Sequence, residues 1–156
     1  QEGDNKNIIF AGSYGTGKSH LAKSICNELQ SFGKPYIFIS APRLFQEIKT
    51  SYNQSSDVSE YELINELISV DVLVIDDLGA EYTKQEQGED VNHSWTNNIY
   101  FNILDGRQGK ITIYTTNLTS PELRNKLGGR NFSRVMKNTV PVKIVTDDYR
   151  LRKVEF

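Results

Sequence analysis

Hydrophobic residues follow two patterns along the chain, and the two patterns alternate. Five short runs of apolar and β-branched residues are typical of buried strands. They occupy residues 8–11, 36–39, 72–75, 111–115 and 140–145. Between them, apolar residues recur every three or four positions, as at Leu21, Ile25 and Leu29, which predicts amphipathic helices. Strands that alternate with helices predict an α/β fold with a five-stranded parallel sheet covered on both faces.

Polar residues and glycines mark where these elements begin and end. Ser120 and Pro121 predict the start of a short helix, with the serine as N-cap and the proline in the first helical position. Glycines at 128–129 predict that this helix breaks and that a second short helix covers residues 130–137. Residues 79–94 are polar and acidic, which predicts a loop.

The first strand leads into a glycine-rich loop with the sequence GSYGTGKS, at Gly12–Ser19. This sequence fits the phosphate-binding pattern of Gly, four residues and Gly-Lys-Ser, and a preceding strand and a following helix are the context that the pattern requires. Backbone N–H groups of such a loop, and those at the start of the helix, bind phosphate oxygens. The alternative is an ordinary glycine-rich turn.

Two side chains of this loop have specific expected roles. Lys18 would reach the β- and γ-phosphates of a nucleotide, and the Ser19 hydroxyl would ligate Mg²⁺. The residues expected to contact the nucleotide are Gly12, Ser13, Tyr14, Gly15, Thr16, Gly17, Lys18, Ser19 and His20.

Acidic and amide side chains follow two of the other predicted strands. Asp76 and Asp77 come directly after Val72–Ile75, and Asn117 follows the fourth strand. Because the carboxyl ends of parallel strands share one edge of a sheet, Asn117 is expected near Asp76 and the γ-phosphate. We expect Asp76 to hold Mg²⁺, Asp77 to act as general base and Asn117 to orient the attacking water. The alternatives are a turn or helix cap for Asp77 and a turn residue for Asn117.

Composition is that of an ordinary globular domain. The chain has 156 residues, 37% hydrophobic and 24% charged, and no apolar run approaches the length of a bilayer span. Its first residue is Gln rather than Met, so we expect a fragment that lacks upstream sequence. The single cysteine, Cys26, fits a reducing cytoplasm and excludes an internal disulfide.

Charge is unevenly distributed. The net charge is −2, but residues 121–156 contain nine Lys and Arg against four Asp and Glu, which gives +5 there and −7 elsewhere. A basic segment of this kind fits nucleic acid, the phosphates of a nucleotide or a solvated face. If single-stranded DNA binds, basic and stacking candidates include Lys110, Tyr114, Arg124 and Lys126.

Five motifs, in a fixed order, resemble those of the AAA+ ATPases, and within them the helicase loaders of bacteria and phages, the DnaC/DnaI type. They are GSYGTGKSHLA (Walker A), VLVIDDLGAE (Walker B), YTTN (sensor 1), GGRNFSRVM (arginine-finger segment) and DYRLR (sensor 2). The resemblance spans essentially the whole chain. It implies that Asn117 is sensor 1, that Arg134 is the arginine finger with Arg130 one turn earlier, and that Arg150 is sensor 2.

The resemblance also implies a fold and partners. The fold would be the three-layer P-loop NTPase (AAA+) sandwich without a C-terminal helical lid, and residues 1–156 would form one ATPase domain that normally follows an N-terminal helicase-binding domain. The implied ligands are ATP or ADP and Mg²⁺. The implied partners are a hexameric replicative helicase, single-stranded DNA and further copies of the chain, in the cytoplasm and without a membrane.

Several functional alternatives remain open at this point. AAA+ proteins usually carry Glu where Asp77 stands, so hydrolysis would be slow, or the chain would be a nucleotide-gated binding module. An IstB-type transposition helper shares this architecture and would prefer duplex DNA. A P-loop kinase for a small metabolite is the third alternative. Arg130 and Arg134 could also be no more than an exposed charge pair.

Overall fold

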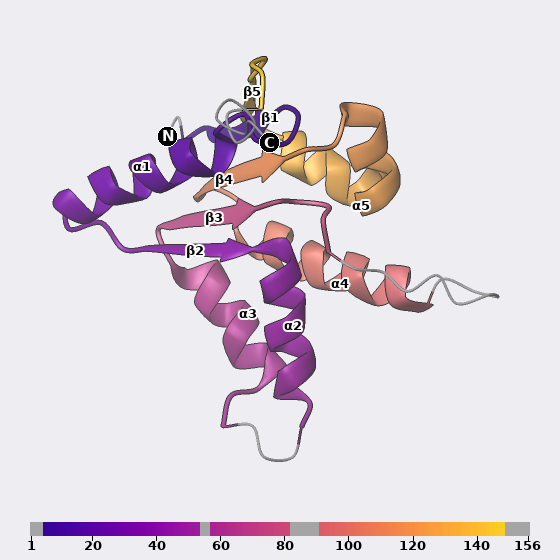
Figure 1. The fold of residues 1–156 in the computed structure, drawn as a ribbon. Coiled ribbons are helices and arrows are strands. Elements are labelled where there is room, and N and C mark those ends of the chain that lie inside the picture. The colour runs from indigo at the N-terminus through magenta and orange to yellow at the C-terminus, as the bar shows by residue number, and fades with distance from the viewer. Residues whose placement is uncertain (1–4, 54–56, 82–90, 149–156) are drawn as a thin grey trace, which may run out of the picture.

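One parallel sheet of five strands organises the molecule. A computed structural model describes residues 5–53, 57–81 and 91–148. The strands are β1 (Asn7–Ala11), β2 (Tyr36–Ser40), β3 (Val72–Asp76), β4 (Ile111–Thr116) and β5 (Thr139–Lys143). They lie in the order β2-β3-β4-β1-β5, and every pair is parallel (Figure 1). The predicted α/β fold is confirmed.

Helices cover both faces of the sheet and make three layers. One face carries α1 (Lys18–Ser31), and the other carries α2 (Ala41–Ser51), α3 (Glu60–Ser69), α4 (Val91–Gly106) and α5 (Ser120–Met136) (Figure 1). The side chains of strand β3 show why both faces of the sheet are covered. Leu73 and Ile75 point into the larger core, whereas Val72 and Val74 point into the core beneath α1, and all four are buried. None of the helices in the described ranges has the length and hydrophobicity that a membrane span needs.

Several predicted boundaries differ from the structure; β5, for example, ends at Lys143 rather than at residue 145. The cap of α5 is Thr119 rather than Ser120, because the backbone N–H and the hydroxyl of Thr119 both donate to Glu122 Oε2, at 2.7 and 2.6 Å. Helix α4 begins at Val91, inside the predicted loop. The predicted break is correct, because Gly128 has φ 74° and ψ 154° and interrupts α5.

The topology brings the predicted site residues to one edge of the sheet. Strand β4 lies between β1 and β3, with Thr116 paired to Ala11 and Tyr114 paired to Ile75. The loop that follows β1 and the polar residues that follow β3 and β4 are therefore neighbours at the carboxyl ends of three adjacent strands.

A buried arginine stabilises the other end of the sheet, at the amino ends of the strands. Arg107, 3% exposed, follows α4 and donates six hydrogen bonds. Its Nη1 donates to Leu67 O and Val70 O at 2.7 and 2.8 Å, its Nη2 to Ile111 O at 2.6 Å, and its Nε to Thr112 Oγ1 at 3.0 Å. Burial lowers the pKa of this guanidinium to about 10, so it stays protonated at neutral pH. Arg107 thus joins the end of α3 to the start of β4.

Candidate active site

The glycine-rich loop wraps around the ammonium group of its lysine. Lys18, 4% exposed, donates from Nζ to Ser13 O at 2.6 Å and to Thr16 Oγ1 at 3.3 Å. The Thr16 hydroxyl donates to the same Ser13 carbonyl at 2.9 Å. Gly17 has φ 90° and caps the start of α1. The arrangement puts a fixed positive charge beside the amino end of a helix, where an anion is favoured.

Residues 144–148, which follow β5, lie close against this loop. A Cβ atom on Gly12 would lie 2.4 Å from Ile144 O, so only glycine fits there. Gly15 has φ 72°, and a Cβ atom on it would lie 1.7 Å from Asp148 Oδ1. The end of the described chain is therefore a neighbour of the phosphate-binding loop.

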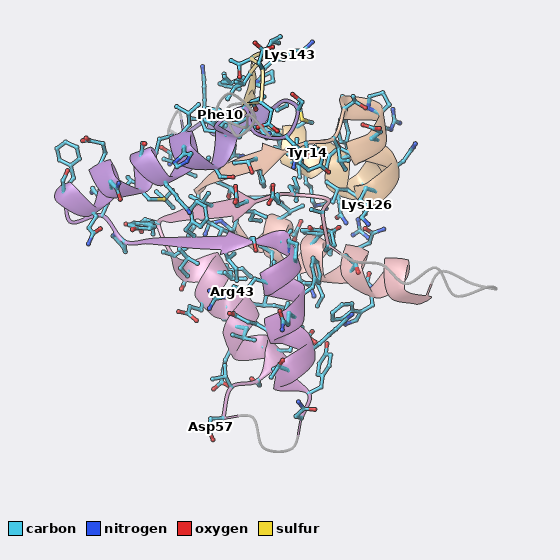
Figure 2. All side chains as sticks on the ribbon, in the orientation of Figure 1. Phe10, Tyr14, Arg43, Asp57, Lys126 and Lys143 are labelled. Carbon is cyan, nitrogen blue, oxygen red and sulfur yellow. The ribbon has the colours of Figure 1, made fainter. Side chains whose placement is uncertain are left out.

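A cavity of about 730 Å³ lies over the loop. Its walls are formed by Tyr14, Gly15, Thr16, Gly17, Lys18, Ser19, His20, Lys23, Asp77, Asn117, Thr146 and Asp147. Tyr14, one of these residues, is 67% exposed (Figure 2). Gly12 and Ser13, also predicted to contact nucleotide, are not among the lining residues and support the loop instead. The volume is typical of a small-molecule site.

Asp76 lies beside the loop, where the sequence predicted a magnesium site. Asp76 Oδ1 accepts hydrogen bonds from Ser19 Oγ at 2.8 Å and from Thr115 Oγ1 at 2.6 Å, and the residue is 8% exposed. Carboxylate and hydroxyl oxygens are the donors that Mg²⁺ prefers. Ser19 and Asp76 therefore fit the ion as a pair of hard oxygen ligands from two different elements.

Thr115 connects the two aspartates, and sequence reasoning missed it. Its hydroxyl also accepts from the backbone N–H of Asp77 at 2.9 Å, and the side chain is fully buried. Asp77 has φ 54°, an uncommon conformation for a residue other than glycine. Asn117 Nδ2 donates to Asp77 Oδ1 at 3.2 Å, so the amide pairs with Asp77 rather than with Asp76. The available signal was a run of threonines at the carboxyl end of a buried strand.

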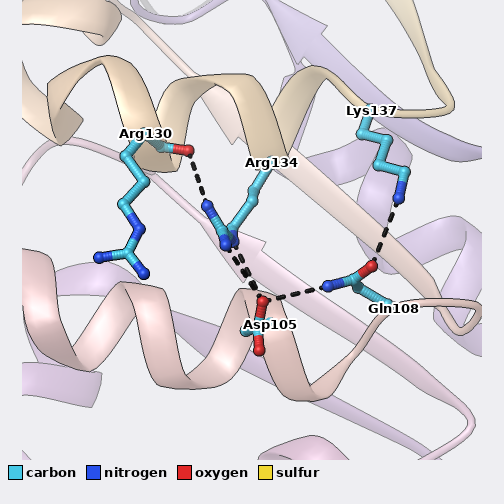
Figure 3. Close-up of polar contacts among 5 residues, drawn as sticks. All are labelled: Asp105, Gln108, Arg130, Arg134 and Lys137. Atoms are coloured by element: carbon cyan, nitrogen blue, oxygen red, sulfur yellow. Dashed lines mark hydrogen bonds and ion pairs between the residues drawn. The ribbon is translucent and has the colours of Figure 1, made fainter.

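The predicted arginine finger lies on α5, away from this cavity. Arg134 pairs with Asp105 of α4, with Nη2 at 3.2 Å from Oδ1 (Figure 3). The guanidinium carbons of Arg130 and Arg134 lie 3.6 and 4.4 Å from the centre of the Phe101 ring. No arginine of the described part of the chain lines the cavity. Arg150 lies outside the described residues.

The prediction that Tyr114 is a candidate for stacking on single-stranded DNA is wrong. Tyr114 is 2% exposed within the core and cannot stack on a base. Lys110 Nζ donates to Ile68 O and Ser69 O at 2.7 and 2.8 Å, at the end of α3. Both residues serve the fold, because they lie on or beside β4 in the middle of the sheet.

Known proteins that are similar to this chain were found by sequence and by structure. The replicative helicase loader DnaC of Escherichia coli (strain K12) is 33% identical over 154 residues, which is 97% of this chain and 59% of that protein. The crystal structure of DnaI superimposes with a TM-score of 0.74 at 25% identity, over 94% of this chain and 74% of that one. Replication initiator DnaA bound to AMPPCP and single-stranded DNA gives 0.72 at 26% identity, over 90% and 41%.

These matches confirm the resemblance to helicase loaders and the P-loop fold, although the chain spans about three-fifths of the curated relative's length. The model of one protein family, described as IstB-like ATP binding protein, matches residues 2–155. That match covers the phosphate-binding loop, both aspartates and the α5 arginines. The chain therefore belongs to the family of IstB-like ATP binding proteins.

Proposed function

We propose that this chain binds ATP with Mg²⁺ and hydrolyses it, and that it serves as the ATPase domain of a replicative helicase loader. The observation that carries the proposal is the network Ser19–Asp76–Thr115–Asp77–Asn117, which lies beside the phosphate-binding loop. A phosphate-binding loop alone would bind nucleotide. The loop together with a metal-type carboxylate and a second, cavity-lining carboxylate can also hydrolyse it.

Each residue has one task in this mechanism. Lys18 and the loop N–H groups bind the β- and γ-phosphates. Ser19 and Asp76 would hold Mg²⁺, which when bound neutralises charge on the phosphate oxygens. Asp77 accepts a proton from the attacking water, and the Asn117 amide keeps Asp77 and the water in line. Thr115 fixes the carboxylate of Asp76 and the backbone of Asp77 relative to each other.

The arginine finger is proposed to act between subunits. The guanidinium of Arg134 pairs with Asp105 of α4 in the same chain. None of the described arginines, Arg134 included, lines the nucleotide cavity of that chain. A second copy that brings Arg134 to the γ-phosphate would supply the missing positive charge. Hydrolysis by a single chain should therefore be slow, and slower still because Asp77 is one methylene shorter than glutamate.

Arg134→Ala should remove the dependence of the ATPase rate on protein concentration. For the wild type without DNA we expect the rate per chain to rise steeply with concentration, whereas the variant should stay at the dilute rate, since an arginine finger contributes roughly 10³-fold or more. Arg124→Ala, an exposed arginine on the same helix, is the matched control. Equal concentration dependence in wild type and Arg134→Ala would refute the finger, provided that Lys18→Ala abolishes turnover.

The loader assignment has support from the relatives. The E. coli relative is named a replicative helicase loader, and a solved structure of similar fold is replication initiator DnaA bound to AMPPCP and single-stranded DNA. By this proposal the partners are a hexameric helicase and single-stranded DNA, and ATP acts as the switch. The transposition helper is the second candidate, because the matching family carries the IstB name.

DNA preference should separate the two candidates. We expect single-stranded DNA to stimulate ATP hydrolysis by this chain more than duplex DNA of the same sequence does, with Asp76→Ala as the blank. Stronger stimulation by duplex would favour the transposition helper. Rapid turnover at high dilution that ignores DNA would refute both and favour the small-molecule kinase, which the comparisons do not support.

A further inference from the structure

We infer that Glu81 and Tyr100 are positioning residues for the general base, because together they hold the turn that carries Asp77. The inference rests on the proposed ATP hydrolysis and concerns the same site. Neither residue lines the nucleotide cavity. Glu81 is the last residue of the VLVIDDLGAE motif but has no role assigned above, and Tyr100 lies outside the five motifs.

The carboxylate of Glu81 is buried, although the sequence placed it in a polar loop. Glu81 is 3% exposed and Tyr100 is fully buried. The Tyr100 hydroxyl donates to Glu81 Oε2 at 2.8 Å, and burial together with the negative charge of Glu81 raises the pKa of Tyr100 well above its usual value. The phenol therefore remains a donor at every physiological pH. Glu81 Oε1 has no hydrogen-bond partner among the described residues.

A charged group buried in the core costs stability, so packing alone does not explain it. Glu81 holds the backbone of the preceding turn, because its Oε2 also accepts a hydrogen bond from the N–H of Gly79 at 3.1 Å. Gly79 has φ 90°, and a Cβ atom there would lie 2.6 Å from Leu118 Cδ1. Lys126, which projects from α5 (Figure 2), donates to Glu81 O at 3.1 Å. Glu81 is thus fixed from both α4 and α5.

The turn that Glu81 holds is the turn that sets Asp77. The N–H of Ala80 donates to Asp77 O at 2.9 Å, which closes residues 77–80 into one turn. On the β4 side, Asp77 is held by Thr115 and Asn117. The positive φ of Asp77 is maintained only if contacts on both sides of the turn hold its backbone. Glu81 and Tyr100 supply the second side, so they fix the direction of the Asp77 carboxylate without touching substrate.

The test compares ATP turnover with nucleotide binding in four variants. Glu81→Ala should lower kcat roughly a hundredfold, the cost of a displacement of about 1 Å in a catalytic group, and Tyr100→Phe about tenfold. KM and the Kd for ATP should change less than about twofold, since the phosphate-binding loop is untouched. Glu81→Gln keeps an oxygen that can accept both hydrogen bonds, so its kcat should stay within about threefold of wild type. Tyr61→Phe, an exposed tyrosine, should match wild type.

The outcomes separate this inference from the proposed function. Wild-type kcat in both Glu81→Ala and Tyr100→Phe would overturn the inference and leave the hydrolysis standing. Glu81→Gln as slow as Glu81→Ala would also overturn it, because the charge rather than the hydrogen bonds would then matter. Absence of wild-type turnover despite ATP binding would overturn the proposed hydrolysis itself. Tyr100→Phe is nearly isosteric, so a folded variant is available even if Glu81→Ala unfolds.

Discussion

Lys18→Ala is expected to reduce ATP hydrolysis to background and to weaken ATP binding by roughly a hundredfold or more. The Lys18 ammonium is the positive charge that the loop itself encloses, 2.6 Å from Ser13 O and 4% exposed. The groups that contact the ammonium within the loop, the Thr16 hydroxyl and the Ser13 carbonyl, carry no positive charge and cannot replace it. Binding would be measured by titration with a fluorescent ATP analogue, and turnover by phosphate release.

Lys34→Ala is the matched control for this prediction. It removes the same charge from an exposed position just after α1, whereas Lys18 stands at the start of that helix. Its binding and turnover should equal those of wild type. If Lys18→Ala kept wild-type affinity, the cavity above the loop would not be the nucleotide site, and the role proposed for Asp77 would fail with it.

Arg107→Met is expected to lower the free energy of unfolding by about 3–5 kcal/mol. Methionine can occupy the space of the arginine stem, but it leaves buried carbonyls such as those of Leu67, Val70 and Ile111 without donors. Urea titration followed by circular dichroism measures the change directly. The ATP affinity of the folded variant should stay near wild type, because Arg107 stands at the amino ends of the strands.

Arg43→Met provides the comparison on the surface. Arg43 forms an exposed i,i+4 ion pair with Glu47, and such pairs contribute about 0.3–0.5 kcal/mol. Its side chain extends from α2 near the edge strand β2 (Figure 2). A similar loss of stability in the two variants would mean that the hydrogen bonds of Arg107 contribute no more than an exposed ion pair.

The sequence was sufficient for the sheet and for the position of the nucleotide loop. Strand, loop and helix follow one another within Ile8–Leu29, so their relation is local, and parallel strands align their carboxyl ends without further information. The same rule brought Asn117 to the edge that carries Asp76, although its amide pairs with Asp77, 40 positions away in the sequence.

What the sequence could not supply was the partner of each buried polar side chain. In the sequence, Thr115 is an ordinary strand residue. Only the pairing of β3 with β4 shows that its hydroxyl contacts both aspartates. Glu81 follows a strand in a polar run, and polar runs are usually solvated. It is buried against Tyr100, which α4 contributes from a later part of the chain. Tyr114 was misjudged for the same reason, since burial is decided by the sheet and not by residue type.

The position of β1 has a consequence for how the protein is made. Although β1 precedes every other strand of the sheet in the sequence, it lies between β4 and β5, with Ile8 paired to both Ile113 and Val140. Chains are synthesised from the amino end at about 5–20 residues per second, and such distant pairings form slowly. A nascent chain therefore emerges from the ribosome with its phosphate-binding loop lacking both neighbouring strands, and the ability to hold nucleotide is acquired among the last steps of folding.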